Sequence, residues 1–187
     1  MRYIALAAVA ALGVSAPAFA AADNGPYFVV GATHDDINGT AAAKGLGIDG
    51  LGATAALGYN MAFGQSFAGV EANFDLSGAK LGDKTNGLYA DNQFGISGRF
   101  GYHLSEGAAF YGVAGYQRGR ASGYSAGVKS SESRDGLRLG AGLEAKVAGP
   151  LGVRVEYNHT HFYRANTDPV NTGLANNQAV VGLVYGF

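Results

Sequence analysis

The strictest pattern in the sequence is an alternation with a period of two over Leu137–Val147, LRLGAGLEAKV. Every odd-numbered position in this segment is Leu, Ala or Val, whereas the even-numbered positions hold Arg138, Glu144, Lys146 and two glycines. Successive side chains of a β-strand point to opposite faces, so this period indicates a strand with one apolar and one charged face. The pattern leaves open whether the charged face meets bulk water or an enclosed space.

The same alternation recurs along most of the chain. We expect further strands at Tyr27–His34, Leu51–Met61, Phe67–Ser77, Gln93–Leu104, Ala109–Arg120, Leu151–His161 and Gln178–Phe187. In Ala109–Arg120 aromatic residues occur at both parities, so the facing of that strand stays open. The chain therefore predicts about eight strands, the smallest number from which membrane barrels are built.

The connections between these segments alternate in length. Short ones fall at Ala62–Ser66, Ser105–Ala108 and Ala148–Pro150, and long ones at Asp35–Gly50, Gly78–Asn92, Ala121–Gly136 and Phe162–Asn177. Short periplasmic turns and long extracellular loops are typical of outer-membrane barrels, as is a girdle of aromatic residues near the strand ends. Candidate girdle residues are Tyr59, Tyr102, Tyr157, Tyr185 and Phe187.

These observations predict an all-β fold, namely an eight-stranded antiparallel transmembrane β-barrel with short periplasmic turns and long extracellular loops. The alternative is a soluble secreted sandwich or a lipocalin-like barrel. A soluble fold would have to build its core from a face of charges and glycines, so the pattern favours the outer membrane.

The first 20 residues have the three parts of an export signal. Arg2 is followed by the apolar run Ile4–Val14 and by Ala18-Phe19-Ala20, which is a small-residue cleavage site. The apolar run is too short to span a bilayer, which requires about 20 residues. We expect Met1–Ala20 to be a signal peptide that is removed, leaving residues 21–187 as one barrel domain.

Composition removes several classes of function. The chain has no cysteine, which excludes disulfides, thiolate metal sites and a cysteine nucleophile. The formal net charge is -1, so there is no basic surplus of the kind that nucleic-acid binding requires. We expect no cofactor and no nucleic-acid partner.

Three stretches carry a resemblance to a known family: YGVAGY at Tyr111–Tyr116, RVEYNHT at Arg154–Thr160 and the terminal VVGLVYGF. With the export signal and the strand count, they resemble the small opacity-type outer-membrane β-barrel proteins, within the larger group of the OmpA membrane domain and the OmpX type. The resemblance implies that the barrel-assembly machinery reads Tyr185 and Phe187 as a C-terminal signal. Phe187 can equally be read as the last aromatic residue of the girdle.

The charges on the face opposite the apolar one form the main candidate site. They are Glu71, Arg99, Arg138, Glu144, Lys146, Arg154 and Glu156. An eight-stranded barrel is just wide enough for side chains to fill its interior, and enclosed charges are tolerable only when they are paired. We therefore predict an ion-pair network that plugs the lumen. The many glycines on the same face favour the alternative, a polar lining around a small water-filled pore.

Catalysis has one candidate pair, His159 and His161, near the outer end of their strand. Lipid A deacylases resemble this chain in size and strand number, and they place a His and a Ser two positions apart with a Glu further on. Here His161 stands where the Ser would be, and Asp168 is the only downstream acid. We expect no enzymatic activity, and no metal site because a third ligand is not evident. We interpret the pair as polar residues at the level of the lipid headgroups.

The long loops supply the remaining candidates. Lys129 and Arg134 belong to the charged stretch Lys129–Asp135, and Arg164 lies where lipopolysaccharide phosphates are expected. The alternative for all three is a solvated loop. The sequence thus predicts a structural or surface-interaction protein that contacts outer-membrane lipid, lipopolysaccharide and possible host or envelope proteins. A low-conductance channel is the first alternative, and a lipid A-modifying enzyme a remote second.

Overall fold

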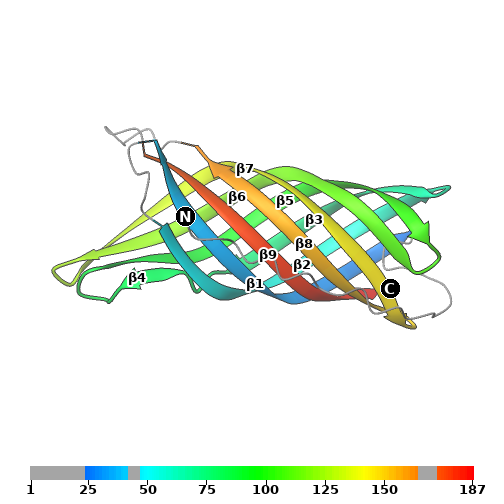
Figure 1. Cartoon of the computed structure of the whole chain (residues 1–187), viewed down its shortest axis with the longest axis horizontal. Helices are drawn as coiled ribbons and strands as arrows, with labels where there is room; N and C mark the ends of the chain where they lie inside the picture. The colour runs from blue at the N-terminus through cyan, green and yellow to red at the C-terminus, as the bar shows by residue number, and fades with distance from the viewer. Residues whose placement is uncertain (1–23, 42–46, 164–171) are drawn as a thin grey trace, which may run out of the picture.

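The computed structural model describes residues 24–41, 47–163 and 172–187, most of which lie in β-strands (Figure 1). In chain order the strands are β1 Gly25–Ala41, β2 Gly47–Phe63, β3 Ser66–Leu76, β4 Lys80–Gly82, β5 Gly87–Ser105, β6 Ala108–Ser125, β7 Val128–Ala148, β8 Leu151–Phe162 and β9 Thr172–Gly186. Over the described ranges, no helix is long and apolar enough to cross a membrane. The predicted signal peptide, Met1–Ala20, lies outside these ranges.

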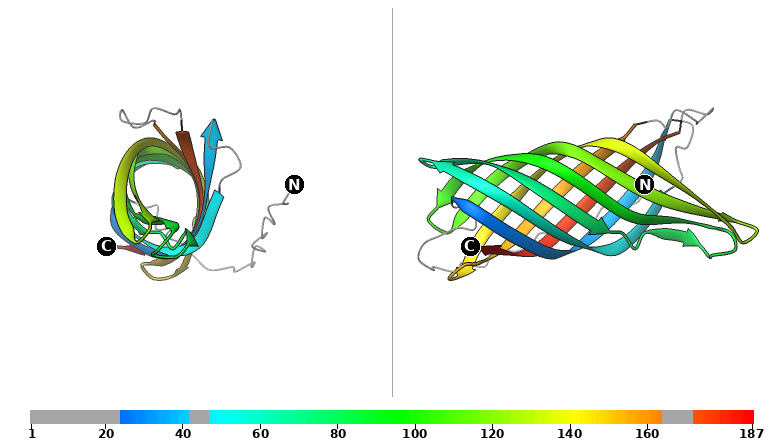
Figure 2. Two further views of the ribbon diagram at one scale, coloured as in Figure 1. Left: turned by 90° about the vertical axis from the view of Figure 1, so that its left-hand side faces the viewer. Right: turned by 180° about the vertical axis from the view of Figure 1, so that it is seen from behind.

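Eight of the strands close into an antiparallel barrel, seen end-on at the left of Figure 2. Neighbouring strands follow chain order, except that β3 pairs with β5. The three-residue β4 pairs only with the start of β5 and stands outside the ring. Pairing of β1 with β9, from Tyr27 opposite Gly186 onward, completes the closure. The prediction of an eight-stranded antiparallel barrel is confirmed.

The strand faces divide as the alternation predicts. In β8, exposed and buried residues alternate without interruption from Leu151 to Phe162. In β7, Arg138 and Glu144 are only 4% and 1% exposed, whereas Leu139 between them is 50% exposed. The charged face is therefore the inside of the barrel, and the apolar face forms its outer surface.

Aromatic residues lie on the outer surface near the strand ends. Exposed members of this set are Tyr59, Tyr102, Tyr185 and Phe187, whereas the predicted girdle residue Tyr157 is exposed midway along β8. The facing of β6, which the sequence left open, is also defined. Tyr111, Val113 and Gln117 are buried inside the barrel, while Phe110 and Tyr116 are exposed on its surface.

The strands extend beyond their predicted bounds into the long connections. Ala121–Gly136 is a regular hairpin in which β6 and β7 pair up to Ser125 opposite Val128. Its two-residue turn, Ala126-Gly127, has positive φ at both positions, as tight hairpin turns require. Strands β1, β2, β5 and β9 likewise extend into predicted loops. Backbone pairing continues because it does not depend on the apolar alternation from which the strands were predicted.

Candidate functional site: the barrel interior

Two arginines and two glutamates form a ring of alternating charge across the middle of the barrel. Arg154 on β8 places Nη1 2.6 Å from Glu71 Oε2 on β3 and Nη2 2.7 Å from Glu144 Oε1 on β7. Arg99 on β5 places Nη2 2.6 Å from Glu144 Oε1 and Nη1 3.6 Å from Glu71 Oε2. Each cation therefore contacts both anions.

A second group of charges continues the ring. Arg138 Nη2 lies 3.1 Å from Glu156 Oε1, and Arg154 Nη1 lies 3.9 Å from Glu156 Oε2. Asp75, which was not among the predicted network residues, lies 3.9 Å from Arg138 Nη1. Six of the seven predicted charges are thus joined. Lys146 lies nearer the short-turn end of β7, where its side chain is half-buried.

Two tyrosines complete the hydrogen bonding of this network. The Tyr27 hydroxyl donates to Glu71 Oε2 at 2.7 Å and accepts from Arg99 Nη1 at 2.6 Å. The Tyr111 hydroxyl donates to Glu156 Oε2 at 2.7 Å, and the Arg99 guanidinium lies 3.9 Å from the centre of the Tyr111 ring. Enclosed charges are stable only with such added partners. Sequence reasoning missed both tyrosines, although both share a parity with inward polar residues of their own strands.

Inward glycines make room for these large side chains. A Cβ atom built on Gly58 would collide with the Tyr27 ring, and one built on Gly142 with the Tyr111 ring. Gly101 likewise faces the ring of Phe67. Similar collisions with inward amide side chains would occur at Gly69, Gly95 and Gly140. These glycines face packed side chains, which corrects the interpretation that they favour water-filled space.

A layer of amides and carboxylates lies between the network and the loop end. Asp35 is fully buried and accepts from Ser77 Oγ at 2.9 Å, Asn176 Nδ2 at 2.9 Å and Gln178 Nε2 at 3.1 Å. Asp75 accepts from three further donors, Thr54 at 2.6 Å, Asn73 at 2.9 Å and Gln117 at 3.1 Å. The polar interior thus continues toward the loop end of the barrel.

The remaining predicted residues lie elsewhere. Lys129 is exposed near the tip of the β6–β7 hairpin, with Nζ 5.9 Å from the Tyr124 ring centre. Arg134 lies on β7, 12% exposed, and its Nε is 3.2 Å from Glu132 Oε1. The rings of Tyr185 and Phe187 are 5.2 Å apart at the short-turn end. Arg164 falls outside the described ranges.

The histidine pair lies on the outer surface. His159 and His161 are both exposed, and His159 Nδ1 is 2.9 Å from Asn177 Oδ1. Asp168 belongs to a stretch that the structure does not describe. Within the part that it does describe, no three His, Asp or Glu side chains are grouped so that they could hold a metal ion.

Known proteins share this architecture. The crystal structure of Ail of Yersinia pestis, in complex with the heparin analogue sucrose octasulfate, is similar with a TM-score of 0.60, 16% identity, and coverage of 88% of this chain and 99% of that one. Neisserial surface protein A has a TM-score of 0.58, 14% identity, and coverage of 86% and 97%. The N-terminal β-barrel domain of Pseudomonas aeruginosa OprF has a TM-score of 0.51 and 12% identity, and the match covers 87% of this chain and 98% of that one. At these identities the likeness establishes the fold alone.

A relative in sequence and a family match indicate where in the cell the protein is located. The 22 kDa outer membrane protein of Rhizobium leguminosarum bv. viciae is 28% identical over 142 residues, which cover 72% of this chain and 65% of the relative. Residues 5–187 match the family described as the outer membrane protein β-barrel domain. The apolar outer surface and the polar interior are those of such a barrel. The chain therefore belongs to the outer membrane protein β-barrel family and is an integral protein of the outer membrane.

Proposed function

We propose that this chain is a non-enzymatic barrel with a closed lumen, which presents its loop end as a contact surface for lipopolysaccharide and other envelope or host ligands. The observation that carries the closed lumen is the charge network. Glu71, Glu144 and Arg154 are each 6% exposed or less, and they come from strands around the ring. An interior filled in this way supports a lumen that is closed to ions.

A low-conductance channel is the second candidate, and one observation favours it. Several buried polar atoms lack a partner, among them Nε of Arg99 and Arg138, Oε2 of Glu144 and both amide atoms of Asn60. Water in the lumen would satisfy such atoms. Steady ohmic current through the purified barrel in a planar bilayer would favour the channel, and its absence the closed lumen.

The loop end supports a contact role through its exposed cations. Lys129 lies at the hairpin tip, and Arg118 is exposed two residues after the outward-facing Tyr116, with Nε 3.7 Å from Asp135 Oδ1. Such cations are suited to bind phosphate groups. The heparin analogue in the Ail structure is a further anion of the kind that this end of the chain would accept.

Lipopolysaccharide binding tests this contact directly. Nanodisc-embedded barrel should bind phosphorylated lipopolysaccharide more tightly than the dephosphorylated form, and Lys129→Ala should reduce the difference. Lys146→Ala, at the opposite end, is the matched control. Equal binding of the two lipopolysaccharide forms would contradict the proposed contact.

Export and assembly complete the proposal. Removal of Met1–Ala20 would leave residues 21–187 as the mature barrel, and the barrel-assembly machinery would read Tyr185 and Phe187. Exposure of both aromatic side chains at the end of the last strand and just after it supports this role. The outward position of His159 and His161 supports a non-enzymatic protein.

A further inference from the structure

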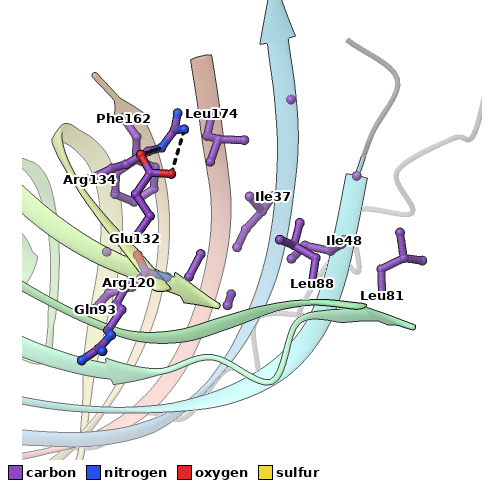
Figure 3. Close-up of a pocket in the computed structure, with 15 residues that line it drawn as sticks. Ile37, Ile48, Leu81, Leu88, Gln93, Arg120, Glu132, Arg134, Phe162 and Leu174 are labelled. Atoms are coloured by element: carbon purple, nitrogen blue, oxygen red, sulfur yellow. Dashed lines mark hydrogen bonds and ion pairs between the residues drawn. The ribbon is translucent and has the colours of Figure 1, made fainter. Parts of the chain in front are cut away.

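The interior of the barrel changes character at the loop end. Below that end the charged and amide side chains share the interior with a few buried apolar ones such as Phe67 and Val113, whereas at the loop end the inward side chains are mainly apolar. Figure 3 shows the cavity that they surround, which has a volume of about 270 Å³ and is called the cup below. Its apolar lining is formed by Ile37, Ile48, Leu81, Leu88, Ala90, Ala121, Phe162 and Leu174.

Phe162 separates the cup from the polar interior. It is 6% exposed, and a Cβ atom built on Gly119 would lie 3.0 Å from its ring. Gln93, which also lines the cup, is buried beside Gly119. The cup is therefore a pocket with its own floor, distinct from the charge network beneath it.

Leu81 and Leu88 show that the cup is unfilled by the described chain. They are opposite each other in the β4–β5 pairing and remain 57% and 44% exposed. Phe94 faces outward on β5, and Leu88 lies six residues before it, about 20 Å along the strand toward the loop end. This distance places Leu88 at the mouth of the barrel. Figure 3 shows Leu88 beside Ile48, on the cup side of the strand. Apolar surface exposed in a water-facing mouth is unfavourable and marks ligand sites.

The polar and charged residues that line the cup are Gln93, Arg120, Glu132 and Arg134. Arg134 and Glu132 both line it, and they are joined by contacts of 3.2 and 3.4 Å. Arg120 lies between the inward Gly119 and Ala121 on β6, so its side chain points to the opposite face of the strand, where it is exposed. Within the described lining, the pair thus contributes one positive and one negative charge, together with hydrogen-bond donors and acceptors.

We propose that the cup binds the acyl chain of an amphiphile whose neutral head, a hydroxyl or an amide, bonds to the Arg134–Glu132 pair. An apolar cavity of about 150 Å³ accepts benzene, so the larger cup has room for a medium-length chain. A balanced ion pair disfavours a charged head, because either charge would meet a like charge within the pocket. This binding site does not depend on whether the lumen conducts or the hairpin contacts lipopolysaccharide.

Fluorescence quenching provides the test, because the chain contains no tryptophan. Leu88→Trp places one indole in the cup, and Ile96→Trp places one on the lipid-facing surface of the same strand. Both full-length variants are embedded in nanodiscs, checked for heat-modifiable migration, and titrated with ω-bromodecanol, whose bromine quenches indole on contact. Leu81→Trp serves as a second cup reporter should Leu88→Trp fail to fold.

The proposal requires that quenching of the cup reporter Leu88→Trp reaches saturation. Quenching of Ile96→Trp should instead rise with the amount of probe that partitions into lipid, without saturation. Adding Ala121→Phe, which fills the cup, should remove the saturable component. ω-Bromodecanoate and its trimethylammonium counterpart should require about tenfold higher concentrations than the alcohol. Parallel, non-saturable curves for the two reporters, or saturation that survives Ala121→Phe, would overturn the site. Equal affinity for all three probes would overturn the neutral-head assignment.

Discussion

Arg154 and Glu71 contact each other across the barrel: Nη1 of the arginine lies 2.6 Å from Oε2 of the glutamate. Their strands, β8 and β3, are not hydrogen-bonded neighbours, because β9, β1 and β2 lie between them on one side of the ring. The pair therefore spans the lumen. Its partners around the ring make the barrel interior one connected polar core.

Removing Arg154 should be strongly destabilising. Arg154→Met leaves Glu71 and Glu144 without their contacts at 2.6 and 2.7 Å. Arg99 still contacts both glutamates, but three buried glutamates then face two arginines in the network, so one negative charge is uncompensated. Removing one partner from a buried ion-pair network costs about 3–5 kcal/mol, so we expect a loss of that size in urea unfolding of the vesicle-embedded barrel. Arg118→Met breaks an exposed pair with Asp135 and should cost less than about 1 kcal/mol. Equal losses in the two variants would refute a network role for Arg154.

The glycine positions should differ in their tolerance of alanine, according to what an added Cβ atom would contact. Gly142→Ala drives a methyl group into the Tyr111 ring, so we expect reduced yield of folded barrel on heat-modifiability gels. Gly112→Ala is the matched control, because its nearest neighbour would be a backbone oxygen at 3.9 Å. The double variant Gly142→Ala/Tyr111→Ala relieves the collision. Its folded yield should therefore be higher than expected if the losses caused by the two single substitutions simply added. Full tolerance of Gly142→Ala would contradict the packed interior.

Acid should loosen the β4–β5 turn. Backbone N–H groups of Asn86 and Thr85 donate to the Asp83 carboxylate at 2.9 and 2.7 Å, and they lower its pKa below the ordinary value. A lowered pKa means that the stabilisation is present above the ordinary aspartate range and is lost as pH falls through the lowered value. Amide exchange at Thr85 and Asn86 should therefore accelerate only at strongly acidic pH. Asp83→Asn should remove that pH dependence, and an unchanged profile in this variant would contradict it.

The final aromatic residue should matter for assembly more than for the finished fold. Phe187→Ala should slow the appearance of heat-modifiable barrel in cells, because the assembly machinery is proposed to read this residue. Phe63→Ala is a matched control, since Phe63 is exposed at the same short-turn end of the barrel. Equal assembly rates for the two variants would assign Phe187 to the girdle alone.

The period of two was enough to predict which face of β7 points inward, because burial inside the barrel and contact with lipid impose opposite polarity on the two faces. It did not place the strand ends, since beyond the bilayer both faces of the β6–β7 hairpin are polar. The inward Ile37 fell within a predicted loop because its sequence neighbours, Asp35, Asp36, Asn38 and Gly39, show no apolar alternation.

Other features depend on contacts that one strand cannot reveal. Tyr27 was overlooked because an aromatic residue was expected to face lipid, although it shares its parity with the inward Thr33 and Asp35. The inward glycines were interpreted as lining space because the side chains that fill that space come from neighbouring strands. Which arginine meets which glutamate follows from barrel closure, which brings β3 opposite β8.

The closed lumen is the central claim, and single-channel recording of the wild-type barrel in a planar bilayer tests it most directly. Replacing Glu71, Arg99, Glu144 and Arg154 together with alanine removes the ring while preserving net charge, and this variant provides the comparison. The ring predicts no steady current through wild-type protein and measurable current through the folded variant. Steady ohmic current through the wild-type barrel, equal to that of the variant, would contradict it.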